Sequence, residues 1–316
     1  MSAPLSSAPG PARAPAADAR AGPWLVLAAA VVWSFGGVFA RLLGDLDPWS
    51  VIFWRSGWAA AFLVGFMLWR DGLRGALGLF RTMGGPGLVV ALAFATASTA
   101  FVIALQVTTV ANVLLIQAGT PLIAALMAWA LFGERVARPT WAAIAAVLLG
   151  VTVMVSGSLG GAVAPLGDAL ALVVALAFAA ATVVTRRYAG VRMAPAVAFG
   201  MILAGLGGAV KAGDLAVEPA EMGLLFAFGA LNLGLGLALF VTGARLTPAA
   251  IAALLGVAET MLGPVWVWLA LGEIPGSRTI LGGAIVLAAL VGHLGWQIFC
   301  RRVEGEPRLK NVAAGR

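Results

Sequence analysis

Residues 120–140, TPLIAALMAWALFGERVARPT, and residues 259–279, ETMLGPVWVWLALGEIPGSRT, follow one pattern. Placed one on the other without a gap, they match at Trp129 and Trp268, Gly133-Glu134 and Gly272-Glu273, and Thr140 and Thr279. Upstream, the same offset pairs Thr108 with Thr247, Ala111 with Ala250, Leu115 with Leu254 and Phe101 with Phe240. Chance similarity between Ala- and Leu-rich helices is the alternative. Because Trp, Gly-Glu and Thr match in one register, the pattern favours an internal repeat.

Long apolar runs surround both stretches. Hydrophobic residues make up 62% of the 316 residues and charged residues 10%, whereas soluble domains carry about 25% charged residues. A bilayer core about 30 Å thick needs about 20 helical residues, and strands of a membrane β-barrel would alternate. The sequence therefore predicts an all-α integral membrane protein with ten transmembrane helices. The predicted spans are 24–43, 48–69, 86–106, 110–131, 141–157, 167–185, 195–213, 222–243, 248–271 and 280–299.

Each repeat holds five of these spans, so the second copy enters the membrane in the opposite orientation. Two inverted five-helix repeats are a transporter architecture, because exchanging the conformations of the halves converts an inward-open form into an outward-open one. We expect four segments along the chain. They are a disordered cytoplasmic tail at 1–22, a first repeat at 23–158, a second repeat at 166–300 and a basic cytoplasmic tail at 301–316.

The positive charges set the expected orientation. Of the 20 Lys and Arg residues, three (Arg41, Lys211 and Arg278) fall in outside loops, Arg55 lies within a span, and the others flank the spans on the side of the termini. The excess of Lys and Arg on the cytoplasmic side places both termini there. Since these charges sit singly or in pairs between apolar runs, they indicate a bilayer as partner and no nucleic acid.

Several chemistries lack their motifs. Cys300 is the single cysteine, there is one histidine, and neither a Gly-Lys-Ser/Thr phosphate loop nor a Gly-x-Ser-x-Gly elbow occurs. We therefore expect no metal site, no cofactor, no catalytic residues and no enzyme activity. An intramembrane enzyme acting on a lipid-linked substrate, and a membrane subunit that does not transport, remain open as alternatives.

The chain resembles the EamA-type transporters of the drug/metabolite transporter superfamily. The likeness rests on the ten spans, the two five-helix repeats, the Gly-Glu that ends spans four and nine, Trp33 in span one and Arg55 in span two, and it covers residues 24–299. Within the family it is most similar to the YddG-type bacterial amino-acid exporters. The resemblance implies export of amino acids or similar metabolites across the cell inner membrane. A sugar or a nucleotide conjugate stays open as substrate.

Glu259 lies about 18 Å into span nine at 1.5 Å per residue, near the middle of the membrane. A charge there is costly and usually serves a function. Its repeat counterpart is Thr120, so the repeat does not require a carboxylate. Glu259 is a candidate contact for a substrate amine, or a proton site. The alternative is a protonated carboxyl bonded to a neighbouring helix.

Two prolines are candidate hinges. Pro121 in span four frees the carbonyl of Gln117, and Pro264 in span nine frees that of Thr260, because proline lacks a backbone N–H. Freed carbonyls at this depth need another partner or a cavity. Gln117 is therefore a candidate substrate contact, beside Asn112. Ordinary kinks with interhelical hydrogen bonds are the alternative.

Aromatic side chains in spans one, three, six and eight are candidates for the wall of a central cavity. They are Trp33, Phe35, Phe101, Phe178 and Phe240, and Asn232 in span eight is a polar candidate. An apolar cavity with few polar groups suits amino acids with apolar side chains, aromatic ones included. Helix packing or lipid contact is the alternative for each aromatic.

Two further ionisable residues are interpreted as structural. We expect Arg55 to extend toward the membrane surface beside Asp45 or Asp47, and His293 to be a hydrogen-bonded packing residue. The expected mechanism is alternating access, with spans one, three and four packed against six, eight and nine. Protons are a candidate coupling ion, and a monomer or weak homodimer is expected.

Overall fold

The computed structural model describes residues 16–44, 46–107, 113, 116–156, 165–272 and 276–313, and within them it is almost wholly helical. The first half holds α1 (Ala16–Trp33), α2 (Gly36–Leu42), α3 (Pro48–Thr82), α4 (Gly84–Val107), α6 (Thr120–Phe132) and α7 (Arg138–Val155). The second half holds α8 (Pro165–Arg187), α9 (Ala194–Lys211), α10 (Pro219–Phe226), the π-helix η1 (Ala227–Gly234), α11 (Leu235–Ala244), α12 (Ala249–Gly256), α13 (Ala258–Leu271) and α14 (Ser277–Ala313).

Most of these helices can cross a membrane. Seven helical segments of the described chain are long and apolar enough to do so, and they coincide with the predicted spans one, two, three, six, seven, eight and nine. Three shorter apolar helices, Thr120–Phe132, Arg138–Val153 and Ile280–His293, lie where spans four, five and ten are predicted. The protein is therefore a multi-pass helical membrane protein, because helices satisfy their backbone hydrogen bonds internally in lipid.

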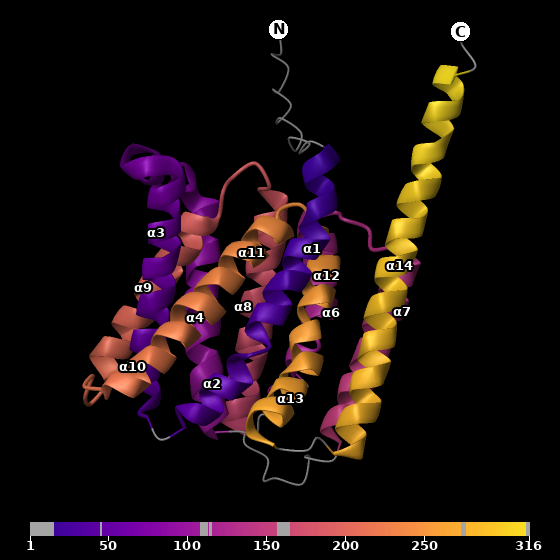
Figure 1. Ribbon diagram of the computed structural model, residues 1–316. Helices are drawn as coiled ribbons and strands as arrows, with labels where there is room; N and C mark the ends of the chain where they lie inside the picture. Colours follow the sequence, from indigo (N-terminus) through magenta and orange to yellow (C-terminus); the bar gives the residue numbers. More distant parts are fainter. Residues whose placement is uncertain are drawn as a thin grey trace, which may run out of the picture.

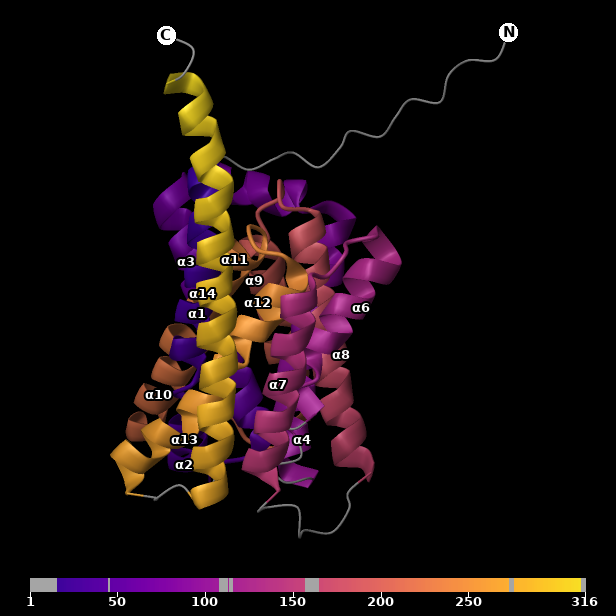
Figure 2. The same cartoon turned by 90° about the vertical axis from the view of Figure 1, so that its right-hand side faces the viewer.

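The helices form a bundle with a common long axis (Figure 1). α1 begins and α14 ends at the same end of the bundle, here named the terminal end, in both views (Figures 1 and 2). The α2–α3 connection lies at the opposite end, here named the far end. α7 and α14 stand side by side along one edge of the bundle.

The packing of the bundle is nearly unchanged when its two halves are exchanged. α1 of the first half packs on α11 of the second, and the corresponding pair, α8 and α4, packs in the same way. α3 packs on α9 and α7 on α14, and each of these pairs joins a helix to its own counterpart, while α6 of the fourth span packs on α12, the first part of the ninth span. Most contacts between the halves therefore recur when corresponding helices are exchanged.

Small residues let these helices approach closely. A Cβ on Gly200 of α9 would meet the backbone of Ala91 in α4, and a Cβ on Gly208 would lie 2.8 Å from the carbonyl oxygen of Trp49 in α3. On α11, Gly243 packs against the backbone of Gly22 in α1. Close backbone contact at small residues is the usual way membrane helices associate, so these glycines hold the two halves together.

The fourth helix of each half is interrupted at the same repeat position. In the first half the Gly119 N–H bonds the Ile116 carbonyl and α6 begins one residue later. In the second half α12 ends at Gly256 and α13 begins at Ala258. Each helix then ends on a glycine with positive φ, 68° at Gly133 and 72° at Gly272, a backbone conformation that glycine adopts readily.

Both candidate hinge prolines lie just after these interruptions. Pro121 is buried in the first turn of α6, where its missing N–H breaks no helical bond. Pro264 lies within α13, after the interruption at Val257, and its side chain falls outside the described part of the chain. The breaks therefore precede both prolines in the sequence.

Three other boundaries differ from the predictions. α1 starts at Ala16, inside the tail expected to be disordered at 1–22, and its Gly22 packs on α11; residues 1–15 lie outside the described chain. α3 continues to Thr82 through a reversal at Gly72, whose φ is 67°. α14 runs on to Ala313, so most of the basic tail is helical. The extensions of α1 and α14 prolong helices whose backbone bonds are already propagating, whereas α3 resumes as a helix after the kink at Gly72.

Candidate functional site

A cavity of about 700 Å³ lies between the two halves, near the middle of the bundle. The lining comes from the α1–α2 break, α2, α3, α4, the segment before α6, α8, α9, η1, α11 and α13, and it reaches Leu46 and Pro48 at the far end. No described residue of α1 before Trp33 contributes to it. The cavity therefore extends toward the far end only, and its size is typical of small-molecule sites.

An aromatic cluster closes the cavity on the side of the terminal end. It consists of Trp33, Phe94, Phe178 and Phe240. The Phe178 ring centroid lies 5.8 Å from that of Trp33 and 4.8 Å from that of Phe240. The offset that places Arg41 on Arg186 also places Trp33 on Phe178, so this contact joins repeat counterparts. Aromatic rings in such contacts bury large apolar areas, which makes the cluster a closed base for the cavity.

The break between α1 and α2 is held by polar side chains. The Ser34 hydroxyl donates to the Val31 carbonyl at 2.6 Å and accepts from the Trp266 indole of α13 at 2.7 Å. The Asn232 amide nitrogen donates to the Val32 carbonyl. A helix end leaves its last carbonyls without intrahelical partners, so these side chains satisfy the break and fix Trp33 at the cavity.

The π-helix η1 brings a second set of groups to the cavity. Phe228 and Asn232, four residues apart, both line it. The Cβ position of Gly229 is occupied by the backbone of Arg55 in α3, so η1 lies directly against that helix. Because π-turns inside helices occur frequently at functional sites, the local widening of span eight supports a role for this segment.

Two opposite charges face the cavity from different helices. Arg55 of α3 is only 8% exposed, and its guanidinium carbon lies 4.4 Å from the Phe228 ring centroid. Glu259 of α13 also lines the cavity and attracts Arg55 electrostatically. Among the described residues the two side chains form no ion pair. The charges therefore face a shared space without direct contact.

The prediction that Arg55 extends toward the membrane surface is wrong. Asp47 accepts a hydrogen bond from the Ser50 N–H at 3.0 Å and caps α3, while Asp45 lies outside the described residues. Arg55 turns inward because the Phe228 ring offers a cation–π contact and Glu259 an opposite charge. The opposite charges in spans two and nine are the sequence signal that could have revealed this.

The structure brings most of the predicted site residues together. Those that line the cavity are Trp33, Phe101, Gln117, Phe178, Asn232 and Glu259. Two others do not line it. Phe35 stacks on Trp266 with ring centroids 4.5 Å apart and is 39% exposed, because the helix break turns it outward. Phe240 is fully buried beneath Trp33 and Phe178. Asn112 lies outside the described residues.

Sequence reasoning missed two aromatic residues of the cavity. Phe94 lies seven residues before Phe101 on α4, and Phe228 lies four residues before Asn232. Residues at these spacings share one face of a helix. The spacing to a residue already singled out is therefore the signal that could have identified each one.

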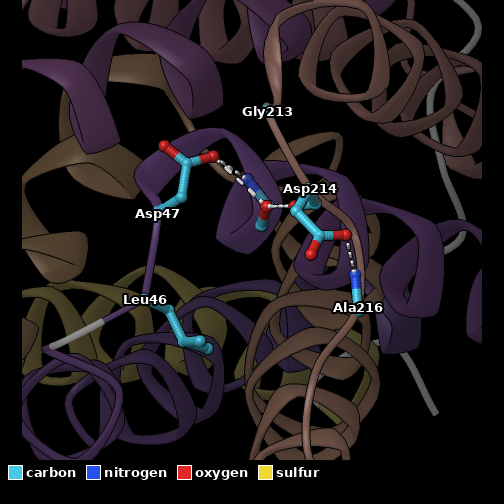
Figure 3. A pocket seen from close by; sticks show the side chains of 6 residues that line it. Leu46, Asp47, Gly213, Asp214 and Ala216 are labelled. Atoms are coloured by element: carbon cyan, nitrogen blue, oxygen red, sulfur yellow. Dashed lines mark hydrogen bonds between the residues drawn. The ribbon is translucent and has the colours of Figure 1, made fainter.

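A second, smaller pocket lies at the far end, between the start of α3 and the α9–α10 loop (Figure 3). Its carboxylates serve the backbone: Asp47 caps α3, and Asp214 accepts from the Ala216 N–H at 2.8 Å. The described residues contain no group of three His, Cys, Asp or Glu side chains that could hold a metal ion. The carboxylates of this pocket therefore bond the backbone of α3 and of the α9–α10 loop.

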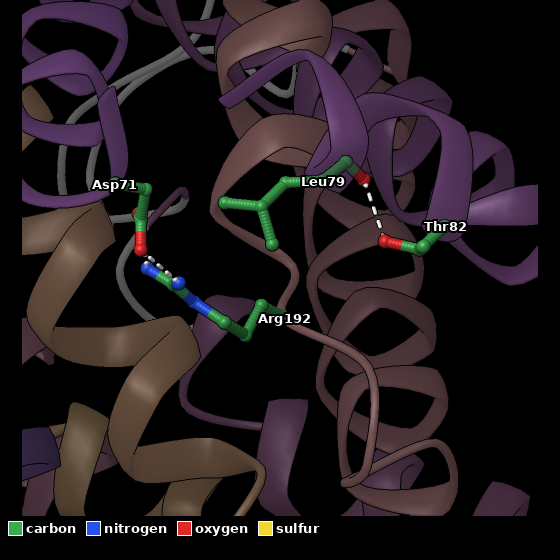
Figure 4. Close-up of polar contacts among 4 residues, drawn as sticks. All are labelled: Asp71, Leu79, Thr82 and Arg192. Carbon is green, nitrogen blue, oxygen red and sulfur yellow. Dashed lines mark hydrogen bonds and ion pairs between the residues drawn. The ribbon is translucent and has the colours of Figure 1, made fainter. Parts of the chain in front are cut away.

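The terminal end is closed by charged contacts between the halves. Arg192 of the α8–α9 loop donates to both carboxylate oxygens of Asp71, at 2.7 and 2.9 Å (Figure 4). Arg186 donates to the Arg245 carbonyl at 3.2 Å and lies 4.0 Å from Glu134. His293, in contrast, is buried beside Trp296 in α14, and no cavity-lining residue comes from that helix.

Comparison with known proteins supports the architecture. One solved structure, titled "Crystal structure of protein", matches with a TM-score of 0.75 and 19% sequence identity, over 90% of this chain and 99% of the other. At this identity the match shows the fold alone. A comparison with curated proteins found no match. The model of the EamA-like transporter family matches twice, over residues 20–156 and 165–294, once for each half. The chain therefore belongs to the EamA-like transporter family.

Proposed function

We propose that the protein is a secondary transporter that exports amino acids with apolar or aromatic side chains across the cell inner membrane by alternating access. The observation that carries this proposal is the cavity of about 700 Å³ between the halves, closed at one end by the aromatic cluster. Its wall is mainly apolar, with a few polar groups and two opposite charges. Such a lining suits a solute with an apolar side chain and a charged head.

The architecture supports a mechanism with two states. We propose ten spans in two inverted repeats, because the helix contacts persist when the halves are exchanged and because both family matches cover one half each. With both termini in the cytoplasm, as the Lys and Arg distribution favours, the described conformation is open to the outside. Exchanging the conformations of the halves would open the cavity to the cytoplasm.

Purified protein in liposomes tests this proposal. Radiolabelled phenylalanine, tryptophan and leucine should enter liposomes that are preloaded with the same unlabelled amino acid, and glucose and uridine should not. Protein-free liposomes are the control. Running the assay with and without a pH gradient shows whether protons are coupled. Flux of the sugar or the nucleoside, with none of any amino acid, would replace the proposed substrate class.

A further inference from the structure

Arg55 is a buried cation for which the described residues offer no contacting counter-ion. It is 8% exposed and lines the cavity, and one face of its guanidinium lies over Phe228. Its Nε and Nη1 atoms have no hydrogen-bond partner among the described residues. A guanidinium carries five N–H donors, and the cation–π contact satisfies none of them. The described residues therefore provide no hydrogen-bond acceptor for these two N–H groups of Arg55.

Two further donors share this property. The Trp33 indole N–H and the Gln117 amide nitrogen are buried and without a partner in the part of the chain that is described, and both residues line the cavity. Asn232 differs, because its amide nitrogen already donates to Val32. Arg55 and Gln117 thus bring unpartnered donors to one cavity, whereas the Trp33 indole nitrogen packs against Gly236 of α11. A carboxylate, which accepts hydrogen bonds at two oxygens, is the complementary group.

Glu259 supplies the opposite charge on the other wall. It attracts Arg55 electrostatically but does not pair with it, so there is room for a solute that contacts both. We infer that Arg55, with Gln117, binds the carboxylate of the transported amino acid while Glu259 faces its ammonium group. Arg55 then determines specificity, because only solutes with a free carboxylate satisfy it. This inference rests on the proposed function.

The wild-type protein gives the first test. Three compounds share one aromatic side chain and differ in their charged groups. Phenylalanine carries both an ammonium and a carboxylate, phenylalaninamide carries only the ammonium, and 3-phenylpropionate carries only the carboxylate. Each compound is added, unlabelled, as a competitor of the uptake of radiolabelled phenylalanine into proteoliposomes. We expect the amide and the propionate to be at least tenfold weaker competitors than phenylalanine. If the amide competes as well as phenylalanine does, the role of Arg55 is overturned. If no amino acid is transported, the proposed function fails, and this inference fails with it.

Variants then assign each charge to its residue. In Arg55→Met the difference between phenylalanine and the amide should fall below threefold, while the penalty for the propionate remains. In Glu259→Gln the penalty for the propionate should shrink and the preference for a free carboxylate should persist. Arg55→Lys should keep part of that preference, since it keeps the charge without the planar geometry of arginine.

The matched control is Arg81→Met, which removes an exposed arginine from the same helix, α3, away from the cavity. It should leave every ratio unchanged. The readout is a ratio between competitors, so it does not depend on the amount of active protein. If Arg55→Met lowers uptake while the ratio between phenylalanine and the amide keeps its wild-type value, Arg55 has a structural role and the inference is overturned. If that variant does not fold, Arg55→Lys and the wild-type series decide.

Discussion

The two halves of the molecule share their packing and differ in their chemistry. Each has a fourth helix interrupted at the same repeat position and ended by a left-handed glycine. After the break the first half has Thr120, which is buried and does not line the cavity, whereas the second half has Glu259, which does. Similarly, Phe101 lines the cavity while its counterpart Phe240 lies beneath it. The interrupted helices that both halves share suit a two-state motion. The cavity residues that differ between the halves suit recognition of one solute.

The largest expected effect comes from the pair Phe101 and Phe240. Phe240→Ala removes a fully buried ring from the aromatic cluster, and such a truncation costs about 3–5 kcal/mol of stability. Phe101→Ala removes a partly buried ring from the cavity wall. It should raise the KM for phenylalanine about fivefold and change stability far less. Thermal unfolding in detergent and uptake kinetics in liposomes measure the two effects.

Leu237→Ala is a useful control, because Leu237 is a buried residue on the same helix as Phe240 and also lines the cavity. It should combine a moderate loss of stability with a moderate rise in KM. If Phe240→Ala and Phe101→Ala behave alike in both assays, the distinction between a base residue and a wall residue is wrong.

The second effect concerns the charge that distinguishes the fourth helices. Glu259→Gln keeps the shape and removes the charge, and uptake of phenylalanine should fall about 30-fold, which corresponds to about 2 kcal/mol. Moving the carboxylate to the other half, in Thr120→Glu with Glu259→Thr, should not restore uptake, because Thr120 does not line the cavity. The measurement is initial uptake rate at several pH values.

Thr120→Ser is the control for the first half, since it keeps a hydroxyl at a buried position. It should reduce uptake less than twofold. Normal uptake by Glu259→Gln at every pH would end the functional interpretation of this residue. Full recovery in the double variant would show that the repeat symmetry extends to the substrate contacts.

The third effect tests the shared packing. Gly200→Val places a side chain against the backbone of Ala91 in α4, and overpacking of this kind costs about 1–3 kcal/mol. Gly207 on the same helix has no heavy atom within 4 Å of its Cβ position, so Gly207→Val should change stability little. The expected difference in melting temperature is about 5 °C, measured in detergent. Equal melting temperatures would argue against close packing of α9 on α4.

The repeat, the helical class and most of the cavity were predictable from the sequence because they leave periodic or matched signals. Trp129 and Trp268, and Gly133 and Gly272, mark the repeat, and Gly133 and Gly272 end their helices with the same backbone conformation. Glu259 stood out in the sequence because a carboxylate within an apolar span is rare, and the structure places it in the cavity lining. These features depend on the local sequence and on the surrounding lipid bilayer.

The direction in which a side chain points was less predictable. Arg55 turns inward because of Phe228, a residue far from it in the chain, and Phe35 turns outward because the helix breaks at Ser34. The π-helix in span eight and the breaks ahead of Pro121 and Pro264 were not predicted either. A hydropathy pattern carries no information on such contacts, so it predicts the helix without its interruption.

The smallest expected effect concerns how the part of α3 before Gly72 contacts the second half at both of its ends. At the terminal end Asp71 forms an ion pair with Arg192, and at the far end the Ser50 hydroxyl donates to the Asp214 carbonyl. Because the ion pair is partly exposed, Asp71→Asn should cost about 0.5–1 kcal/mol, or about 2 °C in melting temperature. The loss should shrink in 1 M salt, since salt screens the pair. Ser50→Ala should cost a similar amount at any salt concentration. The double variant Asp71→Arg with Arg192→Asp should recover the stability that Asp71→Asn loses at low salt. If it does not, the contact depends on the local backbone geometry more than on the two charges.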